Sequence, residues 1–251
     1  MGMKSCLINL MGTSPMVASE MVDFFKSGYN KNLKDVIIIM MDDERIKSGS
    51  YMAGSAIKSR YEDVFIHYKL LNLPDITNEK DINEFIDKIG EIIKKEKDEY
   101  SMDKIYANIT GGRKIESVVL SNFSQLLGID EVWVVLNPVV TNYNIEFEQI
   151  LNELDNFKDD ENVEYYKQNK SKFDPIFYPD LSKLSFFEVT TIKLPLDDLM
   201  VLKQLLKGGI NFKEMGISDY KRDAFVKSKL IGNNKKESNP TELGDIIYKY
   251  I

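Results

Sequence analysis

Two short loops in the sequence carry residue types that can hold a phosphate group. Gly12-Thr13-Ser14-Pro15 follows an apolar run near the N-terminus, and Thr110-Gly111-Gly112-Arg113-Lys114 follows a later one. Glycine has no Cβ atom and tolerates a positive φ, so the backbone of both loops can approach a ligand closely. Hydroxyl groups and, in the second loop, two adjacent cations can then contact phosphate oxygens. The residues alone leave open the alternative of two ordinary strand-to-helix turns with surface cations.

Neither loop matches a familiar nucleotide-binding fingerprint. The P-loop spacing G-x-x-x-x-G-K-[S/T] is missing, and so is the dinucleotide spacing G-x-G-x-x-G. What distinguishes the loops is that each opens a segment with helical periodicity. A helix N-terminus offers unpaired N–H groups and a partial positive charge, which together favour an anion.

The elements around the loops predict an α/β fold. Apolar runs of strand length alternate with helical segments, which is typical of a Rossmann-like, doubly wound, mainly parallel sheet. In such sheets ligands bind beyond the carboxyl ends of the strands, where both loops fall. Pro15 suits the first position of its helix, with Ser14 or Thr13 as the N-cap. The predicted strands are 4–10, 36–41, 64–71, 104–109 and 131–136, and the predicted helices are 15–26, 45–60, 79–97 and 114–127.

Later parts of the chain have other patterns. Residues 142–174 are acidic and predict a helix near 145–157, after which 176–178 and 184–192 resemble late strands. From residue 196 short helices are predicted at 197–207, 211–215 and 218–230, then a polar hairpin near 232–236 and a closing helix at 241–250. This order describes a winged helix-turn-helix module. We therefore divide the chain into a Rossmann-like domain, 1–192, and a winged helix-turn-helix-like domain, 193–251.

Charge is distributed unevenly along the chain. The net charge of −7 argues against a general nucleic-acid coat. Residues 190–251 contain eleven Lys and Arg against eight Asp and Glu, a charge of +3, which leaves −10 for the preceding 189 residues. DNA contact through the C-terminal module is possible, with phosphate-binding cations on its predicted recognition helix. These cations are Lys221, Arg222, Lys227 and Lys229. The alternative is a module that only extends a dimer interface.

Composition narrows the class of protein. No apolar run is long enough to cross a membrane, and the N-terminus lacks the apolar segment of a signal peptide, so we expect a cytoplasmic protein. A single cysteine, Cys6, excludes an intrachain disulfide, and a single histidine, His67, argues against a zinc site. We therefore expect neither a metal nor another cofactor.

The two loops resemble the signature motifs of the CRISPR-associated Rossmann fold (CARF) family. The likeness covers about residues 1–190, and a winged-helix tail is a familiar arrangement in that family. The resemblance implies a homodimer whose two domains bind one cyclic oligoadenylate, most often cyclic tetra-adenylate, on the two-fold axis. Asp42 and Asn137 also follow predicted strands, where contact with adenine or ribose competes with a helix-capping or turn role. The ligand-binding residues that the resemblance implies are Gly12, Thr13, Ser14, Thr110, Gly111, Gly112, Arg113 and Lys114, and the positions at strand ends add Asp42 and Asn137 as candidates.

The resemblance allows more than one function. In a ring nuclease, a ribose 2′-hydroxyl attacks the neighbouring phosphorus without a metal and gives linear products with 2′,3′-cyclic phosphate, which switches off type III CRISPR signalling. Lys114 is then the candidate for stabilising the developing charge, and Ser14 for positioning the reacting ribose or phosphate. The alternative is a transcription regulator that responds to the ring and binds DNA through the winged helix without cleavage. A plain sensor or assembly module is a third possibility.

Overall fold

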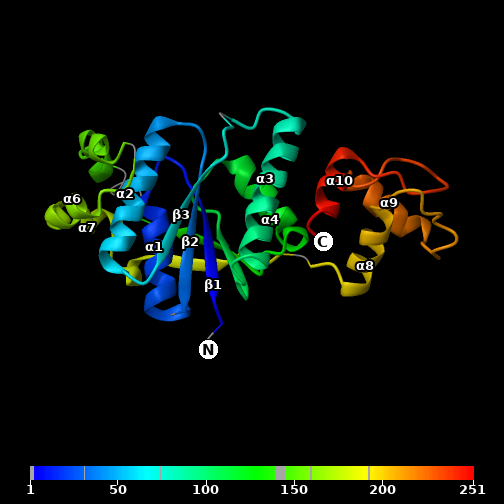
Figure 1. Ribbon diagram of the computed structural model, residues 1–251, viewed down its shortest axis with the longest axis horizontal. Coiled ribbons are helices and arrows are strands. Elements are labelled where there is room, and N and C mark those ends of the chain that lie inside the picture. Colours follow the sequence, from blue (N-terminus) through cyan, green and yellow to red (C-terminus); the bar gives the residue numbers. More distant parts are fainter. Residues whose placement is uncertain (1–2, 31, 74, 139–144, 159, 192) are drawn as a thin grey trace.

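One sheet organises the molecule. The computed structural model describes residues 3–251 apart from residues 31, 74, 139–144, 159 and 192 (Figure 1). Among these residues a six-stranded sheet has the order β3-β2-β1-β4-β5-β6, in which β1 to β5 pair in parallel and β6 pairs antiparallel with β5. The predicted α/β fold is therefore confirmed. The strands are β1 (Ser5–Leu10), β2 (Leu33–Met40), β3 (Phe65–Leu70), β4 (Lys104–Asn108), β5 (Glu131–Leu136) and β6 (Ser185–Glu188).

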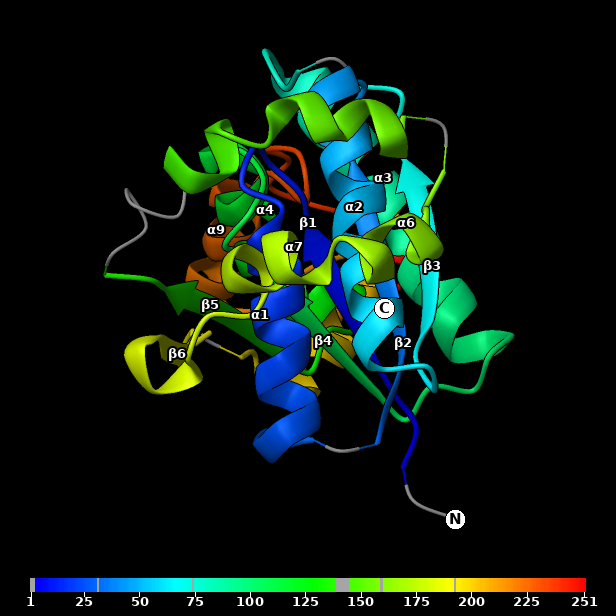
Figure 2. The same cartoon turned by 90° about the vertical axis from the view of Figure 1, so that its left-hand side faces the viewer.

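Helices cover both faces of the sheet, as a doubly wound fold requires. α1 (Met16–Phe24) and α2 (Glu44–Arg60) lie on one face, and α3 (Glu79–Asp98) and α4 (Lys114–Leu127) lie on the other (Figures 1 and 2). Every residue of β1 is buried, and its side chains alternate between two hydrophobic cores. A strand buried on both faces needs a continuous apolar run, which is why such a run predicted β1 correctly.

The start of α1 differs from the prediction. Neither Ser14 nor Thr13 is its N-cap, because Pro15 occupies that position with helical dihedral angles (φ −69°, ψ −19°) and without a side-chain hydrogen bond. The hydroxyl residues of the first loop are therefore not used to cap this helix. At its other end α1 continues into a π-helical turn, Phe25–Tyr29.

The acidic stretch forms helical segments that pack against α1 and α2. Residues 145–148 are helical and are followed by a 3₁₀ segment (Leu151–Phe157), α6 (Val163–Gln168) and α7 (Lys170–Phe177). The strand predicted at 176–178 is wrong, because these residues end α7 and place Phe173, Ile176 and Phe177 at helical spacing in the core. The late strand is confirmed in part as β6, after a 3₁₀ turn at Leu181–Lys183; residue 192 of that prediction lies outside the described residues.

The C-terminal module, residues 193–251, packs against α3 and α4 (Figure 1). It contains α8 (Leu196–Leu205), α9 (Asp219–Lys227) and α10 (Glu242–Tyr248). The helix predicted at 211–215 is wrong, because these residues form turns that end at Gly216 with a φ of +66°. An antiparallel bridge between Ile231 and Pro240 lies at the predicted hairpin. The module's buried residues, among them Leu202 and Ile247, share one hydrophobic cluster with α3 and α4. The domain division and the winged-helix assignment stay predictions.

Candidate functional site

The two glycine loops meet at the point where the strand order of the sheet reverses. β1 and β4 are neighbours, and from them the chain proceeds toward opposite edges of the sheet. Such a switch point is where ligands bind in open parallel sheets. The loops also touch, since a Cβ atom added to Gly12 would lie 3.1 Å from the backbone nitrogen of Gly112. The structure therefore brings the two predicted loops together as one surface.

Close backbone packing explains the double glycine of the second loop. A Cβ atom on Gly111 would lie 1.9 Å from the carbonyl oxygen of Leu10, a distance that no side chain can occupy. Gly112 has a φ of +56°, and a Cβ atom there would lie 2.6 Å from an Oε2 atom of Glu116. Gly111 is thus required by the contact between the loop and β1, and Gly112 by its positive φ, whether or not a ligand is bound.

A buried asparagine fastens the two loops together. The Nδ2 group of Asn108 donates to Asn9 Oδ1 (2.9 Å) and to the carbonyl oxygen of Val17 in α1 (3.1 Å). Its Oδ1 accepts from the backbone N–H (3.1 Å) and the hydroxyl (2.7 Å) of Thr110. Asn9 and Asn108 are both fully buried and lie opposite each other in the β1–β4 register. These four hydrogen bonds of the Asn108 side chain, here called the Asn108 clamp, were not predicted from the sequence. Asn108 and Asn9 are nevertheless conspicuous as polar residues in otherwise apolar runs.

The hydroxyl of Thr110 makes hydrogen bonds within the protein, and its contact with a ligand stays a prediction. Its hydroxyl donates to Asn108 and accepts from the backbone N–H of Val135 in β5 at 2.7 Å. The hydroxyl hydrogen therefore lies in the hydrogen bond to Asn108, and in this arrangement it cannot be donated to a phosphate. Thr110 fixes the second loop to β4 and β5.

The two cations of the second loop lie at the start of α4. Arg113 is the N-cap and Lys114 the first helical residue, and both are exposed. The backbone N–H of Arg113 donates to Glu116 Oε2 at 3.0 Å, which is one half of a capping box. The guanidinium of Arg113 forms an ion pair with Asp75, a residue in the segment between β3 and α3. Lys114 therefore presents its charge at the N-terminus of α4, while Arg113 already has an acidic partner.

Glu116 lies beneath these cations and is almost completely buried. Its Oε1 atom is buried and has no hydrogen-bond partner among the described residues. Burial raises the pKa of this carboxyl, and the N–H and guanidinium groups of Arg113 oppose that rise. The buried Glu116 carboxyl thus holds the backbone of the loop through the Arg113 N–H, while the side chains of Arg113 and Lys114 are exposed.

Asp42 lies at the same edge of the sheet, with different partners from its neighbour Asp43. Asp43 caps α2 by accepting from the backbone N–H of Ile46 at 3.0 Å. Asp42 is exposed, donates its N–H to the carbonyl oxygen of Leu73, and has Lys47 Nζ at 3.3 Å from its carboxylate. The structure therefore places a cation, Lys47, beside Asp42, which the sequence did not predict. The available signal was its position in the first turn of α2, shortly after the end of β2.

Asn137 lies at the end of β5 beside a buried carboxyl group. Its Nδ2 atom is 3.5 Å from Oε1 of Glu20, which is on α1 and only 1% exposed. Burial raises the pKa of Glu20 to about 7, and the Asn137 amide partly offsets this rise. Glu20 shares the buried face of α1 with Met16 and Met21, but its spacing in the sequence does not indicate the contact with Asn137.

The proposed DNA-contacting residues are interleaved with acids. Lys221 pairs with Asp198, Arg222 is 2.8 Å from Asp219 and 2.6 Å from Asp223, and Lys229 is 2.9 Å from Glu79 of α3. Lys227 is exposed at the end of α9. Ion pairs of this kind reduce the positive potential available to a phosphate backbone. DNA binding stays a prediction.

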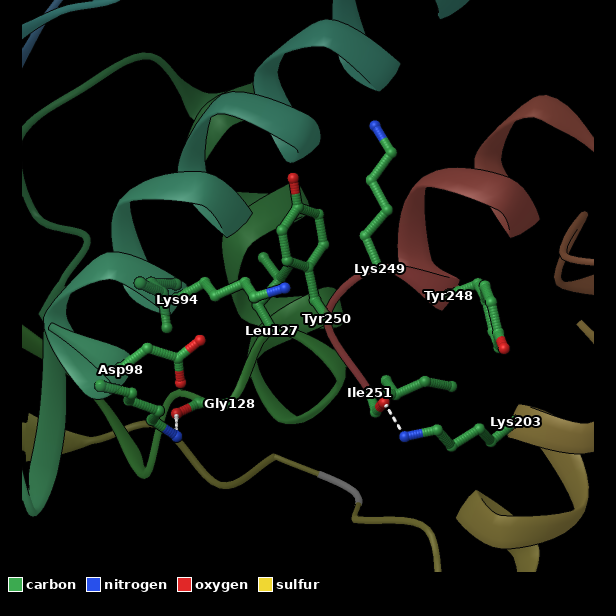
Figure 3. Close-up of a pocket in the computed structure, with 11 residues that line it drawn as sticks. Lys94, Asp98, Leu127, Gly128, Lys203, Tyr248, Lys249, Tyr250 and Ile251 are labelled. Atoms are coloured by element: carbon green, nitrogen blue, oxygen red, sulfur yellow. Dashed lines mark hydrogen bonds between the residues drawn. The ribbon is translucent and has the colours of Figure 1, made fainter.

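A cavity of about 650 Å³ lies away from the loops, where α3 and α4 end against the C-terminal module (Figure 3). Four lysines line it, and three of these have partners in the protein. Lys97 donates to the carbonyl oxygen of Gly128, Lys203 to that of Ile251, and Lys249 pairs with Asp87 at 2.9 Å. Cations near helix C-termini complement the helix dipole, so these lysines have a structural role.

Three features of the described residues bear on the class of protein. No helix among them has the length and apolar character needed to span a membrane. Within the same residues no group of three or more His, Cys, Asp or Glu side chains is arranged to hold a metal ion. Cys6 is fully buried, and burial raises the pKa of its thiol well above the usual value.

Comparison with known proteins finds a family model and a solved structure that match most of the chain. No curated protein matches the chain. Enterococcus italicus Csm6, solved bound to cyclic hexa-2′-fluoro-hexa-dAMP, superposes with a TM-score of 0.50 and 13% identity, over 90% of this chain and 49% of that chain. The chain thus spans about half of that Csm6 chain, and the likeness is one of fold. The family model described as CRISPR-associated protein NE0113 matches residues 14–205. The predicted resemblance to a CRISPR-associated family is confirmed: the chain belongs to the family described as CRISPR-associated protein NE0113.

Proposed function

We propose that the protein binds cyclic tetra-adenylate across the axis of a homodimer and cleaves it without a metal. The observation that carries this proposal is the joining of the two glycine loops at the switch point of the sheet, with Arg113 and Lys114 at the N-terminus of α4. The fold of a Csm6 protein solved with a cyclic oligonucleotide of the same chemical class supports the choice of ligand. Cleavage of the ring would switch off type III CRISPR signalling.

Binding follows from the polarity of the loop surface. The first turn of α4 offers backbone N–H groups and the positive end of the helix dipole to a phosphate. Lys114 adds a full charge at that position, and Arg113 adds a second when it leaves Asp75. The Asn108 clamp holds both loops before the ligand arrives, so that little ordering is needed on binding. A ring with two-fold symmetry would contact the same loops in both subunits.

Cleavage requires in-line geometry and charge stabilisation. The 2′ oxygen of one ribose forms a bond to the adjacent phosphorus while the bond from phosphorus to the 5′ oxygen breaks. The 2′ proton passes to water, and the departing 5′ oxygen takes a proton from water. We assign to Lys114 the stabilisation of the extra negative charge on the phosphoryl oxygens, and to Ser14, in the first loop, the positioning of the reacting ribose or phosphate. The products are linear chains that end in 2′,3′-cyclic phosphate.

The test is to incubate the protein with radiolabelled cyclic tetra-adenylate in EDTA and to follow linear products. We expect turnover by the wild type, and loss of turnover with retained binding in Lys114→Ala. Removal of one charge-stabilising contact should slow cleavage by about 10²- to 10³-fold. Lys213→Ala, at an exposed lysine in the turn after α8, is the matched control and should cleave like the wild type. Unchanged turnover in Lys114→Ala would reject the assigned role.

Binding without any turnover would favour the second function, a regulator that responds to the ring. One structural observation supports that alternative: α4 carries the second loop at its N-terminus and shares a hydrophobic cluster with the C-terminal module along its length. A gel shift on DNA from the protein's own promoter, with and without cyclic tetra-adenylate, tests it. No DNA binding at low salt would exclude this function.

A further inference from the structure

The ion pair between Arg113 and Asp75 occupies one of the two cations of the second loop. Both side chains are partly exposed, 45% for Arg113 and 40% for Asp75, so the pair lies at the surface where a ligand arrives. Asp75 uses its Oδ2 atom for this contact, while its Oδ1 accepts from the backbone N–H of Ile76 at 2.7 Å. The carboxylate of Asp75 therefore occupies the position beside Arg113 that a phosphate of the ligand would take.

A second carboxylate faces the same guanidinium but cannot yield in the same way. Glu116 is 2% exposed and tied to the backbone N–H of Arg113. Burial raises the pKa of Glu116, and the negative charge of Asp75 adds to this rise. Of the two, only Asp75 can move into solvent without leaving a buried charge unpaired.

Asp75 also begins the segment that joins the site to the C-terminal module. Residues 75–79 lead into α3, whose N-cap is Asn78 and whose first residue, Glu79, is 2.9 Å from Lys229 of the module. A cavity of about 470 Å³ separates this segment from α4 and from the module. Its lining includes Ile76, Ile115 and Leu243, one from each of the three parts. The cavity therefore leaves space for residues 75–79 to shift. Such a shift would change the contact of Glu79 with Lys229 of the module.

We propose that Asp75 is an internal counter-anion of the ring site: it holds Arg113 in the free protein, gives it up to a ring phosphate, and so links occupancy of the site to residues 75–79. This inference rests on the proposed function, since the displacing anion is a phosphate of cyclic tetra-adenylate. Asp75 lowers the affinity for the ring, and the displaced segment reports that the ring is bound. The anion exchange forms and breaks only ion pairs and hydrogen bonds.

Asp75→Asn tests the affinity, because asparagine keeps the Oδ1 acceptor for the Ile76 N–H and removes only the charge. Calorimetry with cyclic tetra-adenylate should show binding about two- to fivefold tighter than that of the wild type, the range expected for a surface ion pair. Glu84→Gln is the control, since it removes one negative charge from α3 at a residue that pairs with Lys88. This control should bind like the wild type. Equal or weaker binding by Asp75→Asn would overturn the proposal.

Hydrogen exchange of the amides of residues 76–82 tests the link to the segment. Ring binding should speed their exchange in the wild type, whereas Asp75→Asn should exchange at the faster rate before any ring is added. A ring-induced change of the same size in both proteins would overturn the link. Failure of the proposed function looks different, because then neither protein binds the ring. In that case the two free proteins still test the link: faster exchange in Asp75→Asn than in the wild type supports it, and equal exchange overturns it.

Discussion

Removal of the Asn108 side chain should loosen the two loops and destabilise the protein by a measurable amount. Asn108→Ala deletes four hydrogen bonds, two donated to Asn9 and Val17 and two accepted from Thr110. Each such bond contributes about 0.5–1.5 kcal/mol, and bonds in one network are not additive, so we expect a loss of about 3 kcal/mol. In a chain of 251 residues this lowers the melting temperature by about 6–12 °C.

The assay is equilibrium unfolding in urea, followed by circular dichroism, for wild type, Asn108→Ala and Asn122→Ala. Asn122 is an exposed asparagine on α4, and its substitution should change the free energy of unfolding by less than about 0.5 kcal/mol. Asn108→Ala should also bind cyclic tetra-adenylate more weakly, because the loops must then be ordered by the ligand. A loss of stability below about 1 kcal/mol would refute the reasoning, since it would mean that water or neighbouring groups replace the clamp.

Two further substitutions test the site from other sides. Gly111→Ala should separate the second loop from β1 and abolish ring binding in a gel-filtration or calorimetric assay, because its Cβ atom would lie 1.9 Å from Leu10 O; Gly28→Ala, where nothing lies within 4 Å, should bind normally. Glu20→Gln should change the pH dependence of stability. The folded pKa of Glu20 is about 7 against 4.5 for the free group, so the ionised form is disfavoured in the folded state and the wild type loses stability as pH rises from 4.5 through 7. Urea unfolding at pH 5 and pH 8 should therefore show the variant gaining up to about 3 kcal/mol on the wild type at the higher pH; an equal difference at both pH values would contradict this.

The sequence predicts the sheet and the location of the site better than it predicts the hydrogen bonds and ion pairs of the site residues. β1 and β4 are read correctly because a strand covered on both faces is a continuous apolar run, and the loops after them necessarily share one edge of a parallel sheet. Residues 176–178 are misread because a short apolar run does not distinguish a strand from the end of a helix; only the packing of Phe173 with Phe177 and its neighbours decides it.

The partners of the site residues depend on contacts distant in sequence. Asn108 reaches Asn9 across 99 residues, and nothing in the local spacing of either residue indicates this. Asp75 meets Arg113 only because the segment after β3 passes the N-terminus of α4. The residue types of the loops could be read from the sequence, whereas the acids that oppose their cations could not.

The packing of Gly111 on Leu10 also affects how relatives should be compared. A substitution there is prevented by a backbone contact, so the glycine should persist in relatives that have lost the ligand altogether. Its presence is therefore a marker of loop architecture and a poor marker of activity. Lys114 carries no such packing constraint at its exposed position, so its replacement in a relative would signal a change of chemistry. Under the proposed function, an alignment scored at Lys114, with the glycines set aside, should therefore separate members with ring cleavage from members without it.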